Sequence, residues 1–462
     1  MIDLIRGREI LVVGMACSGL AAVRLLAELG ARRIVVTDRK PEAELQPELA
    51  LLRNFGVVKP VTGGNPPELV HPDLAMIIKS PGVPPTLELF RRAAELQIPV
   101  LSEIELAYAF IKAPLVGITG TNGKTTTTAL TAAILEEAGV KPVMVAGNIG
   151  VPLCEAVGKI GASGVIVVEL SSFQLENIEH FRPAAAVFLN FEADHLNYHG
   201  TVERYFQAKA RIFENQKAGD YAILNAEDRA VASLSTSVPG ELLFFGKSPL
   251  ERGAGLEGDQ LVLFNRGGKP QPVCPRTEIA LPGEHNLENA LAATTAAWAL
   301  GADASAAGRI LRRFRGIAHR LEPVATIKGV EFINDSKGTT PGATIKALRS
   351  FPGKAKILIA GGHDKGSDFQ TLAAVIQAEV KHLVLLGETK QKLAAAVEKA
   401  GFKDYELVNS LEEAVAAAWS RAKAGDLVLL SPACASWDMF PDFEARGNLF
   451  KELVAALKKQ HS

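Results

Sequence analysis

The chain has few cysteines, and they are not spaced for a shared chemical role. Its 462 residues include four, Cys17, Cys154, Cys274 and Cys434, and no two form a C-x-x-C pair. This scarcity argues against a disulfide framework and against a cysteine-based zinc site. It is typical of a protein that works in a reducing cytoplasm.

Long apolar runs and an excess of one charge are also missing. No hydrophobic run is long enough to span a bilayer, and the first residues, "MIDLIRGREILVVG", interleave charges with apolar side chains, unlike a signal peptide. The 50 Lys and Arg residues nearly balance the 51 Asp and Glu residues, for a formal net charge of −1. The sequence therefore gives no reason to expect nucleic acid or a membrane as a main partner.

What the chain has in abundance is short apolar runs separated by Ala/Leu-rich helical stretches. Runs such as "EILVVG", "GVIVVELSS" and "KILIAGGHD" predict buried parallel strands with helical crossovers. They fall into three sets, which predicts an α/β protein with three domains, residues 1–101, 102–316 and 317–462, each with its own doubly wound sheet. The Gly- and Pro-rich stretch 234–282 predicts an irregular β insertion or a sheet edge.

One glycine-rich segment, "GITGTNGKTTT" from Gly117 to Thr127, joins a predicted strand to a predicted helix. Free N–H groups and the helix dipole at such a junction favour an anion, and Gly120 and Gly123 let the backbone wrap closely around phosphates. Lys124 can then reach the β/γ-phosphates of a nucleotide. The alternative is a tight turn with a solvated lysine, which the strand–helix context disfavours.

Three further side chains suggest metal chemistry in the same region. Glu169 ends the predicted strand of "VVELSSFQLE", and Asp194 and His195 follow the next strand, "AAAVFLNF". Carboxylate and imidazole groups beside a phosphate loop are candidate Mg²⁺ ligands and bases. The competing interpretation of His195 is a turn or capping residue.

Lys209 lies on or beside the apolar stripe of a predicted helix, "TVERYFQAKARIFENQ". The ordinary interpretation is a lysine whose ammonium reaches water past the apolar surface. The functional alternative is a buried lysine of lowered pKa that reacts with CO₂, because the resulting carbamate is an anionic oxygen ligand.

Taken together, the motifs resemble those of the Mur ligase family, which assembles the peptide of bacterial cell-wall precursors. The shared motifs, in the family's order along the whole chain, are "GTNGKTT", "GNIG", "ELSSFQL", "DH", "AKARIFE", "GEHNLENALAA" and "HRLE". The resemblance implies Rossmann-like N- and C-terminal domains around an ATPase-like central domain. It also implies ATP, Mg²⁺ and an acyl-phosphate intermediate, in a cytoplasmic, monomeric enzyme needed for cell-wall growth, cell shape and cell division.

The resemblance also assigns roles to individual residues. It implies that Lys124, Glu169, His195, Lys209 and Lys337 are catalytic, and that Thr125, Glu169, His195 and carbamylated Lys209 hold two magnesium ions. The ATP-binding residues that it implies are Gly120, Thr121, Asn122, Gly123, Lys124, Thr125, Thr126, Asn286, Asn289, Arg320 and Asp335. For the asparagines of "GEHNLENALAA", ordinary polar caps at a helix start are the alternative.

The C-terminal part resembles the branch of the family that adds D-glutamate to UDP-N-acetylmuramoyl-L-alanine. The segments concerned are "FINDSKGTTP", "GGHDKGSDF" and "LLSPACASWDMFPDFEARG", although Gly338, Thr340 and the detail of "GGHDKG" differ from the usual pattern. A second carboxylate needs cationic and hydroxyl partners. The amino-acid-binding residues implied are His319, Thr339, Lys365, Ser436 and Phe443, with a solvated loop lysine as the alternative for Lys365.

The N-terminal domain is expected to take the UDP-substrate. "GMACSGLAA" offers N–H groups at a helix start for a diphosphate, and "KSPGVPP" supplies a second loop, whereas the glycine spacing is not that of an NAD fingerprint. The UDP-substrate-binding residues implied are Ser18, Gly19, Asp38, Arg39, Ser80, Pro81, Gly82, Asn148 and Ser171.

Two other functions compete with D-glutamate ligation. One is a ligase of the same family for another amino acid, which "NDSK" and "SPACAS" disfavour. The other is a phosphate-loop NTPase with a regulatory Rossmann-like domain and no ligation, which Glu169, His195 and Lys209 disfavour.

Overall fold

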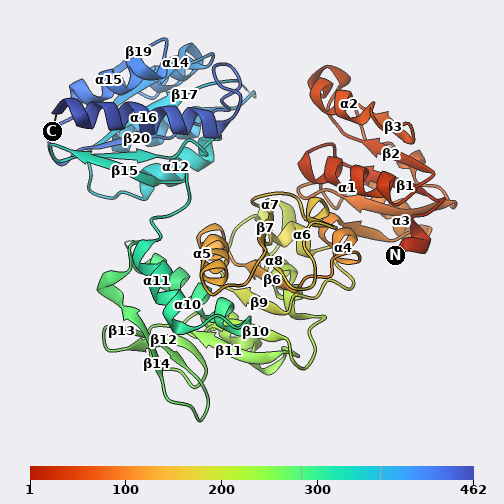
Figure 1. Ribbon diagram of the computed structural model, residues 1–462. Helices are drawn as coiled ribbons and strands as arrows, with labels where there is room; N and C mark the ends of the chain where they lie inside the picture. Colours follow the sequence, from red (N-terminus) through yellow and green to blue (C-terminus); the bar gives the residue numbers. More distant parts are fainter. Residues whose placement is uncertain (282, 365, 462) are drawn as a thin grey trace. The chain divides into compact units, whose positions relative to one another are not determined.

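The computed structural model describes residues 1–281, 283–364 and 366–461, and the chain divides into two compact units, Met1–Phe314 and a second that begins at Arg315. The break lies two residues before Gly316, where the sequence predicts the second domain boundary. Three separate sheets are present, two in the first unit and one in the second (Figure 1). The predicted α/β class is therefore confirmed, while the predicted boundary at residues 101 and 102 stays a prediction.

The first sheet is all parallel, with the strand order β3-β2-β1-β4-β5. Every residue of β1 is buried because helices or loops cover both faces, which is why its sequence is continuously apolar. Its strands are β1 (Glu9–Val13), β2 (Arg33–Thr37), β3 (Val58–Val61), β4 (Leu74–Lys79) and β5 (Val100–Ser102). Its helices are α1 (Cys17–Glu28), α2 (Gln46–Leu52), α3 (Glu88–Glu95) and the 3₁₀ turns η1 (Ile2–Leu4), η2 (Glu42–Glu44) and η3 (Pro67–Leu69).

The second sheet has nine strands in the order β14-β13-β12-β11-β10-β9-β6-β8-β7. Six of its strands form a parallel set: β6 (Leu115–Thr119), β7 (Val143–Gly147), β8 (Val165–Glu169), β9 (Ala185–Phe188), β10 (Tyr221–Asn225) and β11 (Glu241–Phe245). The edge strands β12 (Gly253–Glu257), β13 (Gln260–Phe264) and β14 (Gln271–Pro275) pair antiparallel with one another. The predicted sheet edge in residues 234–282 is therefore confirmed.

Three long helices, α5 (Lys124–Glu137), α10 (Glu284–Ala299) and α11 (Ala304–Arg313), pack together over this sheet (Figure 1). Shorter helices and 3₁₀ turns occur elsewhere in this part of the chain. These are α4 (Glu103–Tyr108), α6 (Ser172–Leu175), α7 (Leu196–His199), α8 (Val202–Ala210), α9 (Arg229–Ala232) and the 3₁₀ turns η4 (Leu153–Ala156), η5 (Arg211–Phe213), η6 (Ser233–Thr236) and η7 (Arg276–Glu278).

A buried carboxylate joins α4 to the loop that leads into β9. Glu105 is 1% exposed, and its two oxygens accept the backbone N–H groups of Glu179, His180 and Phe181 at 2.9 Å each. Three N–H donors satisfy a buried anion where one would not. This contact fixes the segment between the two sheets of the first unit, and one continuous hydrophobic cluster includes residues of both sheets.

The third sheet has the order β15-β16-β20-β17-β18-β19, with an antiparallel β15–β16 hairpin at one edge and parallel pairs elsewhere. Side chains of β17 alternate between two cores, with Leu358 and Ala360 on one face and Ile357 and Ile359 on the other. Its strands are β15 (Glu322–Ile327), β16 (Val330–Asn334), β17 (Lys356–Gly361), β18 (Val380–Leu386), β19 (Tyr405–Leu407) and β20 (Leu427–Leu430). The helices are α12 (Pro341–Arg349), α13 (Gln370–Glu379), α14 (Lys390–Lys399), α15 (Leu411–Arg421) and α16 (Phe443–His461).

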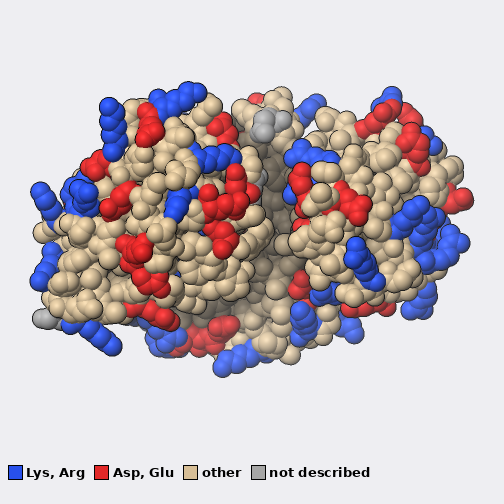
Figure 2. All heavy atoms as spheres, turned by 90° about the horizontal axis from the view of Figure 1, so that it is seen from above, with Lys and Arg blue, Asp and Glu red and all other residues tan. Residues whose placement is uncertain are grey.

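The surface carries both charges in mixture. On the face drawn in Figure 2, basic and acidic side chains alternate over each unit, without a large patch of one sign. This distribution agrees with the formal net charge of −1. Among the described residues, no helix is long and apolar enough to cross a membrane.

Candidate active site

The glycine-rich segment forms the turn between β6 and the N-terminus of α5, as the sequence predicts. Gly123 caps the helix with φ +81°, and a Cβ there would lie 2.2 Å from Oδ1 of Asn289, so the position requires glycine in both conformation and space. The Lys124 ammonium folds back over the turn and donates to the carbonyl oxygens of Gly120 (3.0 Å) and Thr121 (2.9 Å). A helix N-terminus with a lysine in its first turn is suited to binding phosphate.

Residues after β9 hold the outer side of this turn. The Asn122 backbone N–H donates to Oδ1 of Asn190 (2.8 Å), and its side-chain amide donates to Oε2 of Glu192 (3.1 Å). The Thr121 hydroxyl donates to the Glu192 carbonyl oxygen (3.1 Å). Sequence reasoning missed Asn190 and Glu192, although both stand in the "LNFEADH" segment that directly follows a strand.

Helix α10 contributes the inner side of the turn. Asn289 is 5% exposed, its Oδ1 accepts from the Thr127 hydroxyl (3.2 Å), and its amide donates to Oδ1 of Asn286 (3.2 Å). Asn289 therefore lies at the start of α5, beside Gly123, and its amide joins Asn286 to it. This position agrees with a nucleotide-contacting role, which stays a prediction.

Glu169 is a buried carboxylate with one satisfied and one unsatisfied oxygen. It ends β8, is 2% exposed, and its Oε1 accepts from the Asn148 amide (2.7 Å). Its Oε2 is buried and has no hydrogen-bond partner among the described residues. Leaving such an oxygen unpaired is costly, and a cation satisfies it. Asn148, expected to contact the UDP-substrate, thus also orients this carboxylate.

His195 follows β9 with a left-handed backbone, φ +52°, and its backbone N–H donates to Oδ1 of Asp194 (2.8 Å). The ring Nε2 lies 3.6 Å from Oδ2 of Asp194, and the side chain is 47% exposed. Its ring centroid is 5.0 Å from that of Phe173, on the helix after Glu169. The imidazole is therefore accessible to a ligand at the carboxyl edge of the sheet.

Lys209 is buried, with 2% exposure, so the interpretation in which its ammonium reaches water is wrong. Its Nζ donates to the carbonyl oxygen of Gly120 (2.7 Å) and lies 4.8 Å from the ring centroid of Tyr205. Burial and, to a smaller extent, the nearby Lys124 charge lower the pKa of Lys209 to about 7, against opposing effects of Asp194 and Glu169. A large fraction of the amine is therefore neutral, and nucleophilic, near neutral pH.

The residues present fit a magnesium ion only in part as they stand. Among residues 1–281, 283–364 and 366–461, no group of three or more His, Cys, Asp or Glu side chains is arranged to hold a metal. Glu169 offers a buried, unpaired oxygen. The neutral amine of Lys209 would become a second anionic oxygen ligand if it reacted with CO₂ to form a carbamate.

The loops predicted for the UDP-substrate meet at the carboxyl edge of the first sheet. Asp38 accepts the backbone N–H of Met15 (2.9 Å), before α1, and Ser80 donates its hydroxyl hydrogen to the Gly14 carbonyl oxygen (3.3 Å). A Cβ on Gly19 would lie 1.9 Å from that same carbonyl oxygen, so only glycine permits this approach of helix and strand. Ser18 lies in the first turn of α1, and Arg39, Pro81 and Gly82 lie on the loops of Asp38 and Ser80.

A buried lysine that sequence reasoning passed over stands directly before Ser80. Lys79 is 4% exposed, and its ammonium donates to Oε2 of Glu176 (3.0 Å), the Tyr198 hydroxyl (2.5 Å) and Oδ1 of Asn177 (3.4 Å). The Tyr198 hydroxyl also donates to Glu176 (2.7 Å). This network joins the end of β4 to α7, which follows His195, and to the chain after α6, which Ser171 caps.

In the second unit, the predicted residues gather at the carboxyl edge of the third sheet. Asp335 follows β16 and accepts from the Ser431 hydroxyl (2.7 Å), and burial raises the pKa of its carboxyl group to about 6. The Lys337 ammonium lies 5.7 Å from the ring centroid of Phe443. His319 is 6% exposed, its ring is 6.0 Å from that of Phe443, and burial lowers its pKa.

Other predicted amino-acid-binding residues have less defined surroundings. The Thr339 backbone N–H donates to the Lys337 carbonyl oxygen (2.8 Å), and Ser436 is 2% exposed at the end of the loop after β20. Arg320 is exposed at the start of the unit. Lys365 lies outside the described residues, so its role stays a prediction.

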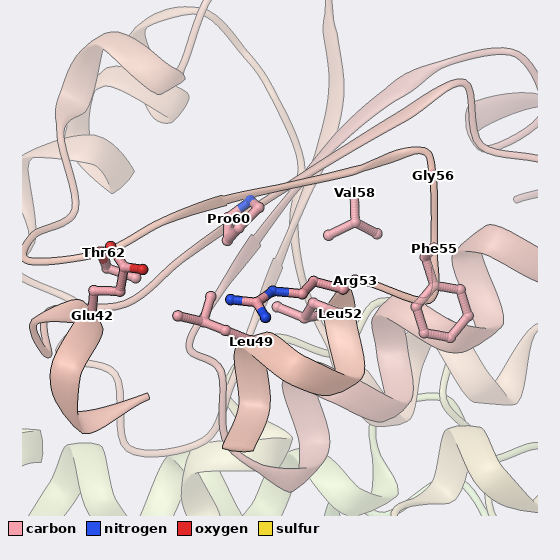
Figure 3. A pocket seen from close by; sticks show the side chains of 9 residues that line it. All are labelled: Glu42, Leu49, Leu52, Arg53, Phe55, Gly56, Val58, Pro60 and Thr62. Carbon is pink, nitrogen blue, oxygen red and sulfur yellow. The ribbon is translucent and has the colours of Figure 1, made fainter. Parts of the chain in front are cut away.

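A pocket of about 380 Å³ lies apart from all these loops, between α2 and the edge strand β3 (Figure 3). The Arg53 side chain crosses its centre between apolar side chains. None of the residues predicted to bind a substrate lines it. The lining residues are Glu42, Leu49, Leu52, Arg53, Phe55, Gly56, Val58, Pro60 and Thr62.

Known proteins resemble this chain over nearly all its length. The Mur ligase middle domain family matches residues 118–297, and the Mur ligase glutamate ligase domain family matches residues 319–434. UDP-N-acetylmuramoylalanine–D-glutamate ligases of Pelotomaculum thermopropionicum and Bacillus cytotoxicus are each 46% identical over 453 residues, 98% of this chain and 98% of each relative. The solved UDP-N-acetylmuramate-alanine ligase of Thermotoga maritima, 20% identical, matches the fold with a TM-score of 0.51 over 97% of this chain and 100% of that chain. The chain belongs to the Mur ligase family.

Proposed function

We propose that the protein is an ATP-dependent ligase that adds D-glutamate to UDP-N-acetylmuramoyl-L-alanine in peptidoglycan precursor synthesis. The observation that carries this proposal is the 46% identity, over 98% of both chains, to ligases named for that reaction. The arrangement of loops supports it, because Ser80, Glu169 and Asp335, one from each sheet, stand at or directly after the carboxyl end of a parallel strand.

The first chemical step joins the γ-phosphoryl group of ATP to the carboxylate of the UDP-substrate and releases ADP. The N-terminus of α5 and Lys124 hold the phosphates, and the asparagines of α10 support the turn from inside. Phosphoryl transfer depends mostly on positioning and on neutralising charge, which this turn supplies. The second step is attack of the amino-acid amine on the acyl phosphate, which forms the amide bond and releases phosphate.

Glu169, His195, Thr125 and a carbamylated Lys209 would hold magnesium ions, which neutralise the phosphate charge when bound. The carbamate forms when the neutral amine of Lys209 adds to CO₂ and loses one proton. Support for this modification comes from the 2% exposure of Lys209 and its pKa of about 7. The modified group would be anionic, so the positive charge that disfavours a cation at this position would be removed.

The amino acid is proposed to bind in the second unit. Ser436, Thr339 and Lys365 would hold its carboxylates, with Phe443 and His319 closing one side, and Lys337 and Asp335 would face the reacting amine and the phosphates. Hydroxyl and cationic partners are what a buried dicarboxylate requires.

The decisive experiment is incubation of the protein with UDP-N-acetylmuramoyl-L-alanine, ATP, Mg²⁺ and a panel of single amino acids, with product masses as readout. We expect a new product only with D-glutamate, together with phosphate release that depends on it. A product formed with a different amino acid would show that this amino acid, and not D-glutamate, is the substrate. Phosphate release without any amino acid would favour an NTPase.

A further inference from the structure

A buried arginine in the second unit, Arg446, belongs to none of the predicted binding sets. It stands in the first turns of α16 and is 2% exposed. Burying a guanidinium is costly unless its N–H groups are paired. The hydrogen-bond partners of Arg446 therefore indicate which segments its side chain stabilises.

The guanidinium donates five hydrogen bonds, all to two loops at the carboxyl edge of the third sheet. Nε donates to the Ser336 hydroxyl (3.0 Å) and Nη2 to the Ser336 carbonyl oxygen (2.9 Å). Nη1 and Nη2 each donate to the Cys434 carbonyl oxygen, and Nη1 also to that of Ala435, all at 3.3 Å. Among the described residues, no carboxylate lies within ion-pair distance of it.

Each loop that Arg446 holds leads directly into a predicted substrate contact. Ser336 precedes Lys337, and Ala435 precedes Ser436. The Ser336 hydroxyl donates in turn to the Phe443 carbonyl oxygen (2.8 Å), and the His363 backbone N–H donates to the Ala435 carbonyl oxygen (2.9 Å). One planar side chain thus fixes the spacing of the segments around the amino-acid site.

We propose that Arg446 is a positioning residue for the amino-acid site: its guanidinium holds the 335–337 and 434–436 loops at the separation that places Lys337 and Ser436 on the substrate. The inference rests on the proposed location of the amino acid in the second unit. A lysine cannot replace the arginine, because a single ammonium lacks the planar fork that reaches both loops at once.

The test compares Arg446→Lys and Ser336→Ala with a matched control, Arg421→Lys, which changes an exposed arginine on α15 of the same unit. KM is measured separately for the amino acid, ATP and the UDP-substrate, together with kcat and the unfolding midpoint. We expect Arg446→Lys to raise the amino-acid KM about tenfold or more, and Ser336→Ala a few-fold, with the KM values of ATP and the UDP-substrate within about twofold. Arg421→Lys should change none of them.

A purely structural role would instead lower the unfolding midpoint and the amount of active protein while leaving the amino-acid KM unchanged, and that result would overturn the proposal. If Arg446→Lys does not fold, Ser336→Ala decides, because it removes one contact of the guanidinium and keeps the arginine. KM is measured with whichever amino acid the wild-type protein ligates. A wild-type protein that ligates none contradicts the proposed function, whereas an active wild type with an unchanged KM in both variants contradicts this inference alone.

Discussion

Two lysines of the first unit, Lys79 and Lys209, are almost equally buried, at 4% and 2% exposure, but their surroundings differ. Lys79 has a carboxylate, a hydroxyl and an amide oxygen around its ammonium. Lys209 has one hydrogen-bond acceptor among the described residues, the carbonyl oxygen of Gly120, and a second lysine close enough to repel it.

The difference teaches that burial alone does not decide what a lysine does. Burial lowers the pKa of both amines, but the contact with Glu176 opposes that effect at Lys79. At Lys209, the charge of Lys124 adds to it, and the pKa falls to about 7. The first surroundings stabilise an ammonium in a structural network, and the second favour a neutral amine that can be modified.

The largest effect is expected from Lys209→Ala. Without the carbamate, the site loses one anionic ligand for the magnesium that would neutralise the phosphate charge, and we expect turnover to fall by roughly 10³-fold while the protein stays folded. The rate of phosphate release under ligation conditions measures this loss. A short carboxylic acid in the medium should restore part of the activity by occupying the vacated space. Activity near the wild-type level in Lys209→Ala would show that Lys209 has only a structural role.

Lys124→Ala should have the next largest effect, roughly 10²-fold or more on turnover, because the turn loses its charge at the phosphates while remaining able to form. The same change sharpens the comparison of the two lysines. Removing the Lys124 charge should raise the pKa of Lys209 and reduce its modification, while Lys79 is unaffected. Turnover assays with carbamate quantification in the same sample measure both effects, and unchanged turnover would refute the phosphate-loop assignment.

Activity of enzyme stripped of CO₂ should return with bicarbonate, and the rate of return should depend on pH. Only the neutral amine adds to CO₂. Since the pKa of Lys209 is about 7, the neutral fraction is nearly complete well above pH 7 and falls about tenfold per pH unit below it. We therefore expect slower recovery at low pH, measured by stopped assays at constant dissolved CO₂. A pH-independent recovery would contradict the lowered pKa.

The smallest effect on chemistry is expected from Lys79→Met. The change removes three polar contacts, so we expect a loss of about 1–3 kcal/mol in the free energy of unfolding. Turnover at saturating substrates should change by only about two- to three-fold, because Glu176 and Tyr198 remain bonded to each other. Denaturant unfolding and steady-state kinetics measure the two quantities. A loss of activity as large as that of Lys209→Ala would contradict the claim that Lys79 is structural and Lys209 catalytic.

The sequence predicts the phosphate loop well because its requirements are local. Gly123, Lys124 and the helix after them lie within a few residues, and the structure has the predicted strand, turn and helix. Local patterns also predict Glu169, at the end of a strand, and Lys209, on the apolar stripe of a helix. The predicted helix around Lys209 is shorter than expected, since α8 ends at Ala210 and a 3₁₀ turn follows.

Contacts between distant segments could not be predicted in the same way. Lys79 contacts Glu176 and Tyr198 across 97 and 119 residues, and Arg446 contacts Ser336 across 110 residues. Nothing in the local pattern of "KSPG" or "FEARG" shows that these cations are buried. The sequence alone therefore does not predict contacts between side chains that only the folded sheets bring together.

The most direct test of the difference between the two lysines is carbon-13 NMR of the folded protein in carbon-13-labelled bicarbonate. A lysine carbamate gives a carbonyl signal separate from bicarbonate and dissolved CO₂. We predict one such signal in the wild-type protein and in Lys79→Met, and its absence in Lys209→Ala. A wild-type protein without the signal, or a signal that persists in Lys209→Ala and disappears in Lys79→Met, would contradict the account.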